Sequence, residues 1–341
     1  MTEPLRWGAV GASWIAEDWV IPAIRQTGAE VVAVSSNDAE RATAYAAKNA
    51  IRAAYASLDG LLADPNVDAV YISSTNQWHH PQTVAAARAG KHVLCEKPMA
   101  TTLEEARAMI AACESAGVVL AIDHHMRNAP TLRTIKRLLD EGAIGRPLAV
   151  RIAHAILLPD FLRTWRTSAP DAGGGPILDL TTHDTDNLRF ILDDEVEEVV
   201  AMTAGQRFSA NGVEDAVMAV LRFRGGVIAS THGAYTLGGS RTALEVHGTD
   251  GSLIGTEVLR QSPVGDVVLR RGDDVEPVDV GERSDLYAAG IRAFTDAARG
   301  HGRPTTTGED GLRALEVALA VAEAARTGRR VTVGGSGVTA A

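Results

Sequence analysis

The stretch Arg6–Ala16, "RWGAVGASWIA", decides the fold. A short apolar run opens it, as in a buried strand, and a helical pattern follows. Gly11, Ser13 and Ala16 have the spacing of a dinucleotide-binding fingerprint, in which small residues allow a tight turn, approach to a pyrophosphate, and packing of helix on strand. Ser13 departs from the usual glycine, but it is small and its hydroxyl can bond a phosphate. An ordinary tight turn is the alternative; the position at the first strand–helix junction favours a nucleotide.

The alternation of strand and helix continues to about residue 125. Strand-like apolar runs occupy residues 30–36, 67–75, 92–97 and 118–123, and helical patterns occupy residues 16–28, 38–49, 79–90 and 102–117. Near-continuous apolar strands separated by helices indicate a parallel sheet covered on both faces. Residues 1–125 are therefore predicted to form an α/β, doubly wound Rossmann domain that binds the nucleotide.

The pattern changes beyond residue 125. Longer strands, which read as antiparallel, are predicted at residues 147–158, 195–205, 214–226, 227–236, 242–251 and 266–274, and helices at residues 131–145, 176–192 and 308–328. Gly225-Gly226 and Asp250-Gly251 mark hairpins between successive strands. Residues 126–333 are predicted to form an α+β domain that binds the substrate.

Composition narrows the classes of function. The chain has 341 residues, enough for two domains, and its net charge is 33 − 43 = −10, which argues against nucleic acid as a partner. Its two cysteines, Cys95 and Cys113, are expected to be free thiols in a reducing compartment. No signal peptide opens the sequence and no apolar run reaches the roughly 20 residues that span a bilayer, so a soluble cytoplasmic protein is predicted.

The end of the second predicted strand bears on the choice of cofactor. NAD sites usually place a carboxylate there, against the ribose 2′-hydroxyl. This chain has Ser36 and Asn37 instead, and Arg41 lies one turn into the next helix. Asp38 comes one or two residues late and suits a helix N-cap. A neutral serine with a nearby arginine suits a 2′-phosphate, so NADP(H) is favoured over NAD(H).

Two further sequence patterns indicate candidate catalytic residues. Glu96-Lys97-Pro98 stands at the exit of a predicted strand, at the sheet edge where ligands bind, and the proline keeps Lys97 out of helical geometry. Asp179 and His183 are four residues apart in a predicted helix, so the carboxylate can orient the imidazole and favour its protonated form. A surface turn and a solvated Asp/His pair are the respective alternatives.

Other polar residues near these patterns have less definite roles. Trp165 and Arg166 are suited to line a sugar or cofactor site, although core packing explains Trp165 equally well. Asp184 and Asp186 are expected to point elsewhere on the helix and to be solvated. No HExxH-like spacing or cysteine cluster is present, so no metal is expected.

In order along the chain, the segments "GASWIA", "STNQWHH", "AGKHVLCEKPMA", "GGGPILDLTTHD", "GVEDAVMAVLRF" and "LEVHGTDGSLIG" resemble the glucose–fructose oxidoreductase/inositol dehydrogenase family of NAD(P)-dependent sugar oxidoreductases. The resemblance covers nearly the whole chain. It implies a second domain with an open-faced, mainly antiparallel sheet, which in some members packs against another subunit; a monomer is the alternative. It also implies a cis Lys97-Pro98 bond and a sugar as the substrate partner.

The resemblance also implies a set of site residues. Lys97, Asp179 and His183 would be the catalytic set. Cofactor contacts would come from Gly11, Ala12, Ser13, Trp14, Ile15, Ser36, Asn37, Arg41, Ser74, Thr75, Asn76, His79, Glu96 and Lys97, with Trp165 and Arg166 on the nicotinamide side and Tyr287 closing the site. Asp123 departs from the pattern, which has an amide at that position.

The activity implied is NADPH-dependent reduction of a keto-sugar, with 1,5-anhydro-D-fructose reduced to 1,5-anhydro-D-mannitol. An NAD-dependent sugar or inositol dehydrogenase is the first alternative. A glycosidase that transiently oxidises its sugar and retains NAD is another. A non-catalytic nucleotide-sensing regulator is an alternative of a different class, but it should have lost the catalytic set, which this sequence retains in full.

Overall fold

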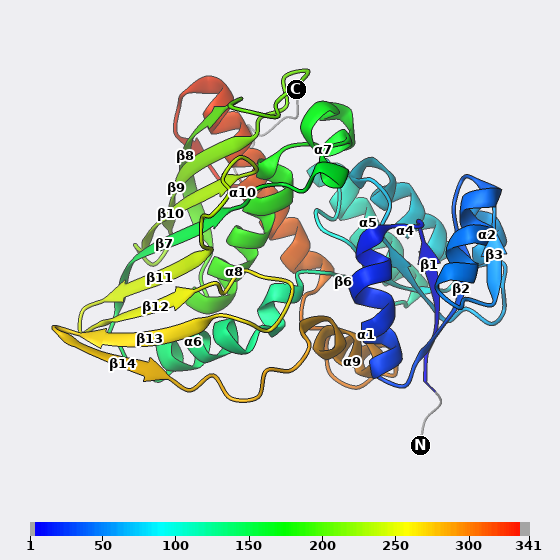
Figure 1. Cartoon of the computed structure of the whole chain (residues 1–341), viewed down its shortest axis with the longest axis horizontal. Helices are drawn as coiled ribbons and strands as arrows, with labels where there is room; N and C mark the ends of the chain where they lie inside the picture. Colours follow the sequence, from blue (N-terminus) through cyan, green and yellow to red (C-terminus); the bar gives the residue numbers. More distant parts are fainter. Residues whose placement is uncertain (1–3, 335–341) are drawn as a thin grey trace. The chain divides into compact units, whose positions relative to one another are not determined.

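The computed structural model describes residues 4–334, which form two compact units (Figure 1). Of these residues, the first unit contains 4–125 together with Tyr287–Leu312. The second contains Met126–Leu286 and residues 313–334.

The first unit is built on a six-stranded parallel sheet in the order β3-β2-β1-β4-β5-β6. Its strands are β1 (Arg6–Val10), β2 (Glu30–Ser35), β3 (Ala53–Tyr55), β4 (Ala69–Ile72), β5 (His92–Cys95) and β6 (Leu120–Ile122). The predicted doubly wound sheet is confirmed; the short strand β3 was not anticipated. After β3 the chain crosses to the other side of β1 to form β4, so the strand order switches between β1 and β4, where ligands bind in such sheets.

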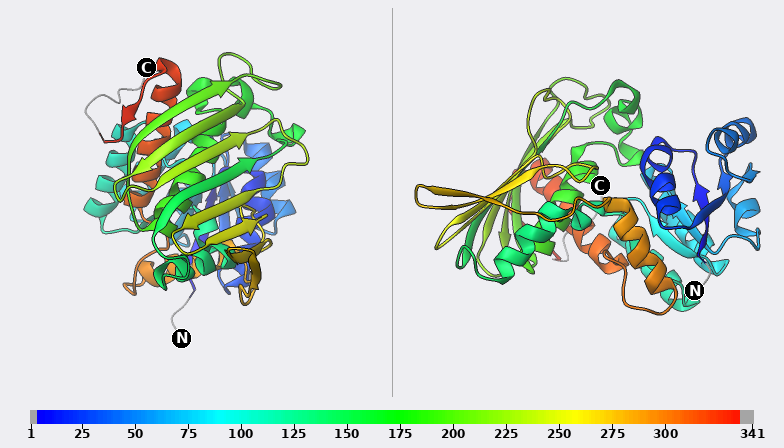
Figure 2. Two further views of the ribbon diagram at one scale, coloured as in Figure 1. Left: turned by 90° about the vertical axis from the view of Figure 1, so that its left-hand side faces the viewer. Right: turned by 60° about the horizontal axis from the view of Figure 1, so that its bottom comes forward.

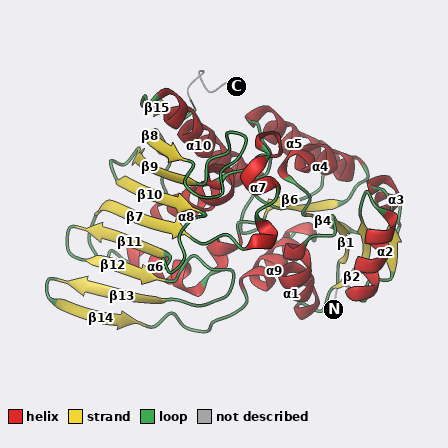
Figure 3. Cartoon of the chain, turned by 45° about the horizontal axis from the view of Figure 1, so that its top comes forward, coloured by secondary structure: helices red, strands yellow, loops and turns green. Residues whose placement is uncertain are grey.

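Helices cover both faces of this sheet (Figure 3). They are η1 (Ala16–Val20), α1 (Ile21–Gln26), α2 (Ala39–Lys48), α3 (Leu58–Leu62), η2 (Asn76–Trp78), α4 (His79–Arg88), α5 (Leu103–Ala116) and α9 (Leu286–Ala298). On one face η1, α1 and α9 share a core with apolar residues of the sheet. On the other, Cys113 of α5 and Thr83 of α4 lie near Cys95 of β5. Cys95 and Cys113 are buried free thiols, as predicted.

The helix α9 is where the structure departs from the predicted domain division. The sequence assigns all of residues 126–333 to the second domain, whereas Tyr287–Leu312 pack with the first unit. The cause is the apolar side of α9: Ile291 and Phe294 are buried, and the ring of Phe294 lies 5.0 Å from that of Trp7 in β1. This packing joins a late segment of the chain to the first strand.

The second unit contains a nine-stranded sheet in the order β14-β13-β12-β11-β7-β10-β9-β8-β15. Its strands are β7 (Pro147–Ala155), β8 (Val196–Ala204), β9 (Ala216–Phe223), β10 (Ile228–Ala234), β11 (Ala243–Gly248), β12 (Ser252–Thr256), β13 (Asp266–Arg271), β14 (Asp274–Val278) and β15 (Val331–Thr332). Neighbouring strands are antiparallel except β7 and β10. The hairpins predicted at Gly225-Gly226 and Asp250-Gly251 join β9 to β10 and β11 to β12.

One face of this sheet packs on helices and the other is open (Figure 2). The helices α6 (Pro130–Asp140), α8 (Thr182–Leu192) and α10 (Gly308–Thr327) contribute to the core on the covered face. The alternation of β9 shows both faces, because Leu221 and Phe223 are fully buried while Met218 and Val220 are 58% and 43% exposed. The predicted open-faced sheet is thus confirmed.

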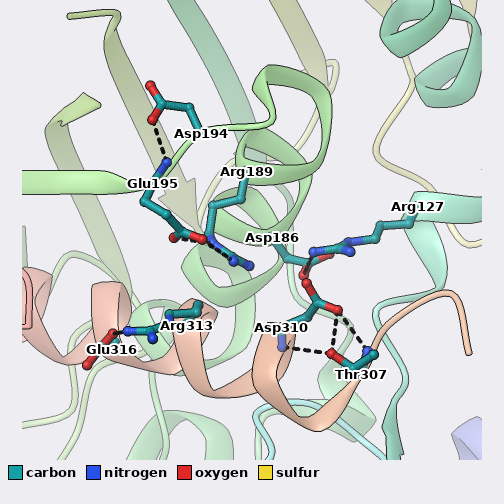
Figure 4. Close-up of polar contacts among 9 residues, drawn as sticks. All are labelled: Arg127, Asp186, Arg189, Asp194, Glu195, Thr307, Asp310, Arg313 and Glu316. Atoms are coloured by element: carbon teal, nitrogen blue, oxygen red, sulfur yellow. Dashed lines mark hydrogen bonds and ion pairs between the residues drawn. The ribbon is translucent and has the colours of Figure 1, made fainter. Parts of the chain in front are cut away.

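A buried ion pair connects α8 to the segment before α6 in the second unit (Figure 4). Arg127, just before α6, donates from Nε and Nη2 to the two carboxylate oxygens of Asp186 in α8, each over 2.7 Å. Asp186 and its neighbour Asp184 are fully buried. The expectation that these two aspartates are solvated is therefore wrong, because each meets a basic side chain from another element that helix periodicity does not reveal.

Candidate active site

The turn after β1 is tight and is built from small residues. Gly11 has φ +98°, and a Cβ there would lie 3.2–3.4 Å from the backbone of Ser73 and Ser74, so the close approach needs glycine. Ser13 Oγ lies 2.7 Å from Ser73 Oγ and accepts from the N–H of Ala16 over 3.2 Å. The small residues predicted from the fingerprint thus let the ends of β1 and β4 meet.

The residues after β2 lie against this turn. Nη2 of Arg41 donates to the carbonyl of Ala12 over 2.7 Å, which places the guanidinium beside the loop. Asp38 caps α2, because its Oδ1 accepts from the N–H groups of Glu40 and Arg41, as the sequence indicated. Ser36 Oγ accepts from the N–H of Asp38 over 3.3 Å, and Asn37 is exposed. The remaining turn residues, Trp14 and Ile15, are partly buried.

The segment after β4 is held by His79. This histidine is fully buried, and its ring nitrogens lie 2.8 Å from the carbonyl oxygen of Pro98 and 3.1 Å from that of Ser74. Burial lowers the pKa of His79, despite these two carbonyls. Ser74 also donates from Oγ to Gln82 over 2.7 Å. His79 therefore ties the loop of Thr75 and Asn76 to the segment that follows β5.

The lysine predicted to be catalytic lies in that segment. Lys97 is half-buried, and its bond to Pro98 is cis, as expected. Its backbone N–H donates to Glu96 Oε2 over 3.2 Å, while Glu96 Oε1 accepts from the hydroxyl of Tyr71 over 2.6 Å. Glu96 is thus anchored beside Lys97 by a tyrosine from the neighbouring strand β4, which the sequence did not indicate.

Tyr287 lies in the core of the first unit. It is 2% exposed, its ring stacks on that of His125 at 4.4 Å, and it packs against Trp19 at 5.9 Å. These contacts account for its burial without a ligand.

Asp179 is held in the second unit by two side chains. It lies in a π-helical turn, η6 (Ile177–Thr181), rather than in the regular helix that the sequence predicts. Oδ2 of Asp179 accepts from the hydroxyl of Tyr235 over 2.7 Å and lies 3.7 Å from Nε of Arg166. Burial and then the charge of Asp179 raise the pKa of Tyr235 well above its usual range, so the phenol keeps its proton and donates.

Trp165 and Arg166 form α7 (Trp165–Ser168), and the guanidinium of Arg166 lies over the Trp165 ring at 4.5 Å. Arg166 therefore joins Trp165 to Asp179. Three of the predicted site residues, Trp165, Arg166 and Asp179, are thereby brought together within the second unit.

His183 follows in α8 and is 4% exposed. Its ring centroid lies 6.2 Å from that of His154 in β7. Nδ1 of His154 lies 3.0 Å from Asp184 Oδ1. Burial raises the pKa of Asp184, although the nearby His154 acts against that shift. His183 thus lies next to a second, buried histidine that is itself held by a carboxylate.

Two acidic residues of "GVED" organise the segments around Asp179. Glu214 accepts from the N–H of Ile177 over 3.2 Å, at the start of the π-helical turn. Asp215 accepts from four successive backbone N–H groups, those of residues 206–209, over 2.6–3.1 Å. Burial opposes ionisation of Asp215, but these bonds outweigh it and lower its pKa. Neither role was predicted, and the only sequence signal was the place of "GVED" in the family pattern.

Replacing Tyr235 with phenylalanine tests the support of Asp179. Loss of one hydrogen bond to a charged group costs about 1.5–3 kcal/mol, so kcat should fall at least about tenfold while nucleotide affinity stays unchanged. Tyr55→Phe is the matched control, since it removes a tyrosine–aspartate bond, to Asp64, in the first unit. An equal effect of both substitutions on kcat would show that Tyr235 does not act through Asp179.

The first unit fits a dinucleotide. The turn at Gly11, where a Cβ would press against the backbone of Ser73 and Ser74, lies where the strand order switches. Arg41 adds a cation beside it. In the described part of the chain no group of three or more acidic, histidine or cysteine side chains is placed to hold a metal ion, and no helix is long and apolar enough to cross a membrane.

Comparisons with known proteins agree with this geometry. Residues 5–124 match the oxidoreductase family with an NAD-binding Rossmann fold, and residues 132–254 match the C-terminal domain of the GFO/IDH/MocA proteins. The chain is 51% identical to a 1,5-anhydro-D-fructose reductase of Ensifer adhaerens over 96% of its own length and 98% of the relative's. It is 30% identical to a myo-inositol 2-dehydrogenase of Thermotoga maritima over 88% of its length and 90% of the relative's.

Among solved structures, an aldose–aldose oxidoreductase from Caulobacter crescentus matches with a TM-score of 0.89 and 28% identity, over 97% of this chain and 100% of the other. With the sequence matches to both halves of the chain, this structural match leads to one conclusion: the chain is an oxidoreductase that belongs to the GFO/IDH/MocA family, whose N-terminal domain is an NAD-binding Rossmann fold.

Proposed function

We propose that this protein uses NADPH to reduce a keto-sugar, 1,5-anhydro-D-fructose, to 1,5-anhydro-D-mannitol. The observation that carries the choice of substrate is the similarity to the Ensifer adhaerens reductase, which extends over almost the whole of both chains. The chemistry is supported by the presence of all three catalytic candidates, Lys97, Asp179 and His183. The backbone of Lys97 bonds Glu96, Asp179 accepts from Tyr235, and His183 is buried.

Each catalytic residue has a distinct proposed role. A bound NADPH would supply the hydride. Lys97 donates a hydrogen bond to the carbonyl oxygen of the sugar, and His183 gives a proton to that oxygen as it becomes an alcohol. Asp179 keeps the imidazole oriented, while Tyr235 and Arg166 hold Asp179. General acid help of this kind is worth about 10²–10⁴ in rate.

NADPH is favoured over NADH by the residues after β2. Oδ1 of Asp38 is occupied by two backbone N–H groups of α2, so its part in the fold is that of a helix cap. Ser36 brings no charge. Arg41 uses Nη2 on the carbonyl of Ala12, and a guanidinium has five N–H donors, so others remain for a 2′-phosphate. Asn37 would add a neutral contact at the ribose.

Two substitutions test this preference. Ser36→Asp places a carboxylate against the 2′-phosphate, so the KM for NADPH should rise while the KM for NADH stays equal or falls. Arg41→Ala should raise the KM for NADPH by roughly tenfold or more, the value of a charge-assisted hydrogen bond, and change that for NADH much less. Arg88→Ala, at an exposed site in the last turn of α4, is the control. Equal effects of Arg41→Ala on both cofactors would remove the phosphate role.

The second candidate is an NAD-dependent sugar or inositol dehydrogenase, favoured by the NAD-binding description of the matched family and by the inositol dehydrogenase relative. A NADPH-oxidation screen over keto-sugars, with NADH in parallel and with NAD⁺ plus inositol in the reverse direction, separates the two. A regulator without turnover would be inactive in every assay. A glycosidase that retains NAD would cleave its sugar without net consumption of cofactor.

The remaining partner assignments belong to the same proposal. Association of two copies through the open sheet face would cover the exposed apolar side chains of Val200, Met202, Met218 and Val220; a monomer is the alternative. A cytoplasmic location accords with the two buried free thiols.

A further inference from the structure

Two carboxyl groups and a phenol meet beside Lys97, at the carboxyl ends of three neighbouring strands. Tyr71 lies in β4, Glu96 follows β5, and Asp123 follows β6. Their exposed fractions are 1%, 9% and 8%. Two negative charges so close together and so far from water would repel each other strongly.

Glu96 is surrounded by hydrogen-bond donors. The hydroxyl of Tyr71 donates to its Oε1 over 2.6 Å, and the backbone N–H of Lys97 donates to its Oε2 over 3.2 Å. Since an ionised carboxylate is an acceptor only, this surrounding suits the charged form of Glu96.

Asp123 has the opposite surroundings. Its side chain makes a hydrogen bond with that of Glu96, which requires a proton on one of the two groups. Within residues 4–334, its buried Oδ2 has no hydrogen-bond partner that would stabilise a negative charge. Its backbone N–H donates to the carbonyl of Cys95 over 2.8 Å, which fixes the residue beside the end of β5.

Glu96 and Lys97, at the end of β5, act on the charge of Asp123, and Tyr71 of β4 and Cys95 of β5 also interact with it. Burial first, and then the charge of Glu96 and the bond to it, raise the pKa of Asp123 well above its usual range, while the ammonium of Lys97 acts in the other direction. Burial and the charge of Glu96 also raise the pKa of Tyr71 and of Cys95, so both of these stay neutral. Glu96 and Lys97 thus act on Asp123 with opposite charges.

We propose that Asp123 is a neutral carboxylic acid in the folded protein, and that it donates its proton to Glu96 and so keeps Lys97 in position. Asp123 acts through Glu96 and is a positioning residue. The part of the proposal that concerns turnover rests on the proposed function, because it needs Lys97 to act on the substrate. The protonation of Asp123 does not depend on that function.

Ionisation of Asp123 would have two consequences. Glu96 would lose a donor, and a second negative charge would draw the ammonium of Lys97 toward the two carboxylates. An amide at residue 123 would keep the donor without bringing a charge. Asparagine is therefore the substitution that leaves the arrangement intact, and alanine is the one that removes it.

Urea unfolding between pH 5 and pH 8 tests the proton directly, with wild type, Asp123→Asn and the control Asp59→Asn, which alters an exposed aspartate of the same unit. A carboxyl group whose pKa is raised by folding binds a proton that the unfolded chain has lost above about pH 4. Relative to Asp123→Asn, the unfolding constant of wild type should therefore rise about tenfold per pH unit, up to the pKa of Asp123 in the folded protein. The ratio of the unfolding constants of wild type and Asp59→Asn should not change with pH.

If the ratio of the unfolding constants of wild type and Asp123→Asn stays constant across this pH range, Asp123 is ionised in the folded protein. If Asp123→Asn does not fold, the carboxylate is required. Either result overturns the proposal. Measurements of kcat compare Asp123→Ala with Asp123→Asn. The alanine variant should have a lower kcat than wild type, whereas the asparagine variant should keep the wild-type kcat. Any loss of kcat that accompanies deprotonation of Asp123 at high pH should be absent from the asparagine variant. Equal losses in both variants would contradict the positioning role. If wild type reduces no keto-sugar, the proposed function fails. The unfolding measurements still show whether Asp123 is protonated in the folded protein.

Discussion

Substitution of His183 by asparagine should lower kcat for reduction by about 10²–10⁴-fold, the range that a positioned general acid contributes. Asparagine keeps a polar group of similar reach but has no proton to transfer near neutral pH. The affinity for NADPH should change little, because the NAD-binding Rossmann fold lies in the first unit and His183 lies in the second. Stopped-flow turnover and fluorescence titration of NADPH measure the two quantities separately.

The pH profile gives a second readout of the same substitution. The reference pKa of histidine is about 6.5, so kcat of wild type should fall as pH rises through the pKa of the acid in the ternary complex. In His183→Asn that fall should disappear. His154→Asn is the companion variant, because His154 is the neighbouring buried histidine. Retention of near-normal kcat in His183→Asn, or an equal loss of NADPH binding and turnover, would transfer the acid role to Lys97.

Substitution of Lys97 by methionine should have the next largest effect on turnover. Methionine has a similar length but no charge and no donor, so the developing negative charge on the substrate oxygen loses one stabilising hydrogen bond. Loss of a donor of this kind costs about 10²–10³ in kcat. The backbone N–H that donates to Glu96 is retained, so the anchoring of Glu96 by this segment should persist.

Two comparisons make the Lys97 result specific. Lys48→Met removes an exposed lysine of the same unit, which pairs with Glu17, and should leave kcat unchanged. Lys97→Arg keeps the charge but brings a larger, planar group, and should restore little activity. Full activity in Lys97→Met would show that the lysine does not contact the reacting oxygen.

The features that could be predicted from the sequence were those that depend on short local patterns of residues. Gly11 was readable because a tight turn at a strand end leaves a short signature, and the two hairpins were readable because Gly-Gly and Asp-Gly favour the turns that they form. Asp38 was recognised as a cap for the same reason. Each of these depends on residues within a few positions of one another.

The features that the sequence did not reveal depend on long-range contacts. Tyr235 is 56 residues from Asp179 in the chain, and Arg127 is 59 residues from Asp186, so neither partnership has a periodicity. Asp179 also lies in a π-helical turn. The prediction that Asp179 and His183 share one helix face assumed the regular spacing of an α-helix. The return of α9 to the first unit depends on the packing of Phe294 against Trp7, which only the folded chain shows.

Transfer of the hydride from NADPH to the sugar can be followed with an isotope label. Wild-type protein is incubated with 1,5-anhydro-D-fructose and NADPH that carries deuterium at the transferable position of the nicotinamide, and the product is examined by NMR, with labelled NADH in parallel. We expect one deuterium on the former ketone carbon of 1,5-anhydro-D-mannitol for each NADPH consumed, and a slower reaction with NADH. Binding of NADPH without its consumption, or transfer only from NADH, would contradict this expectation.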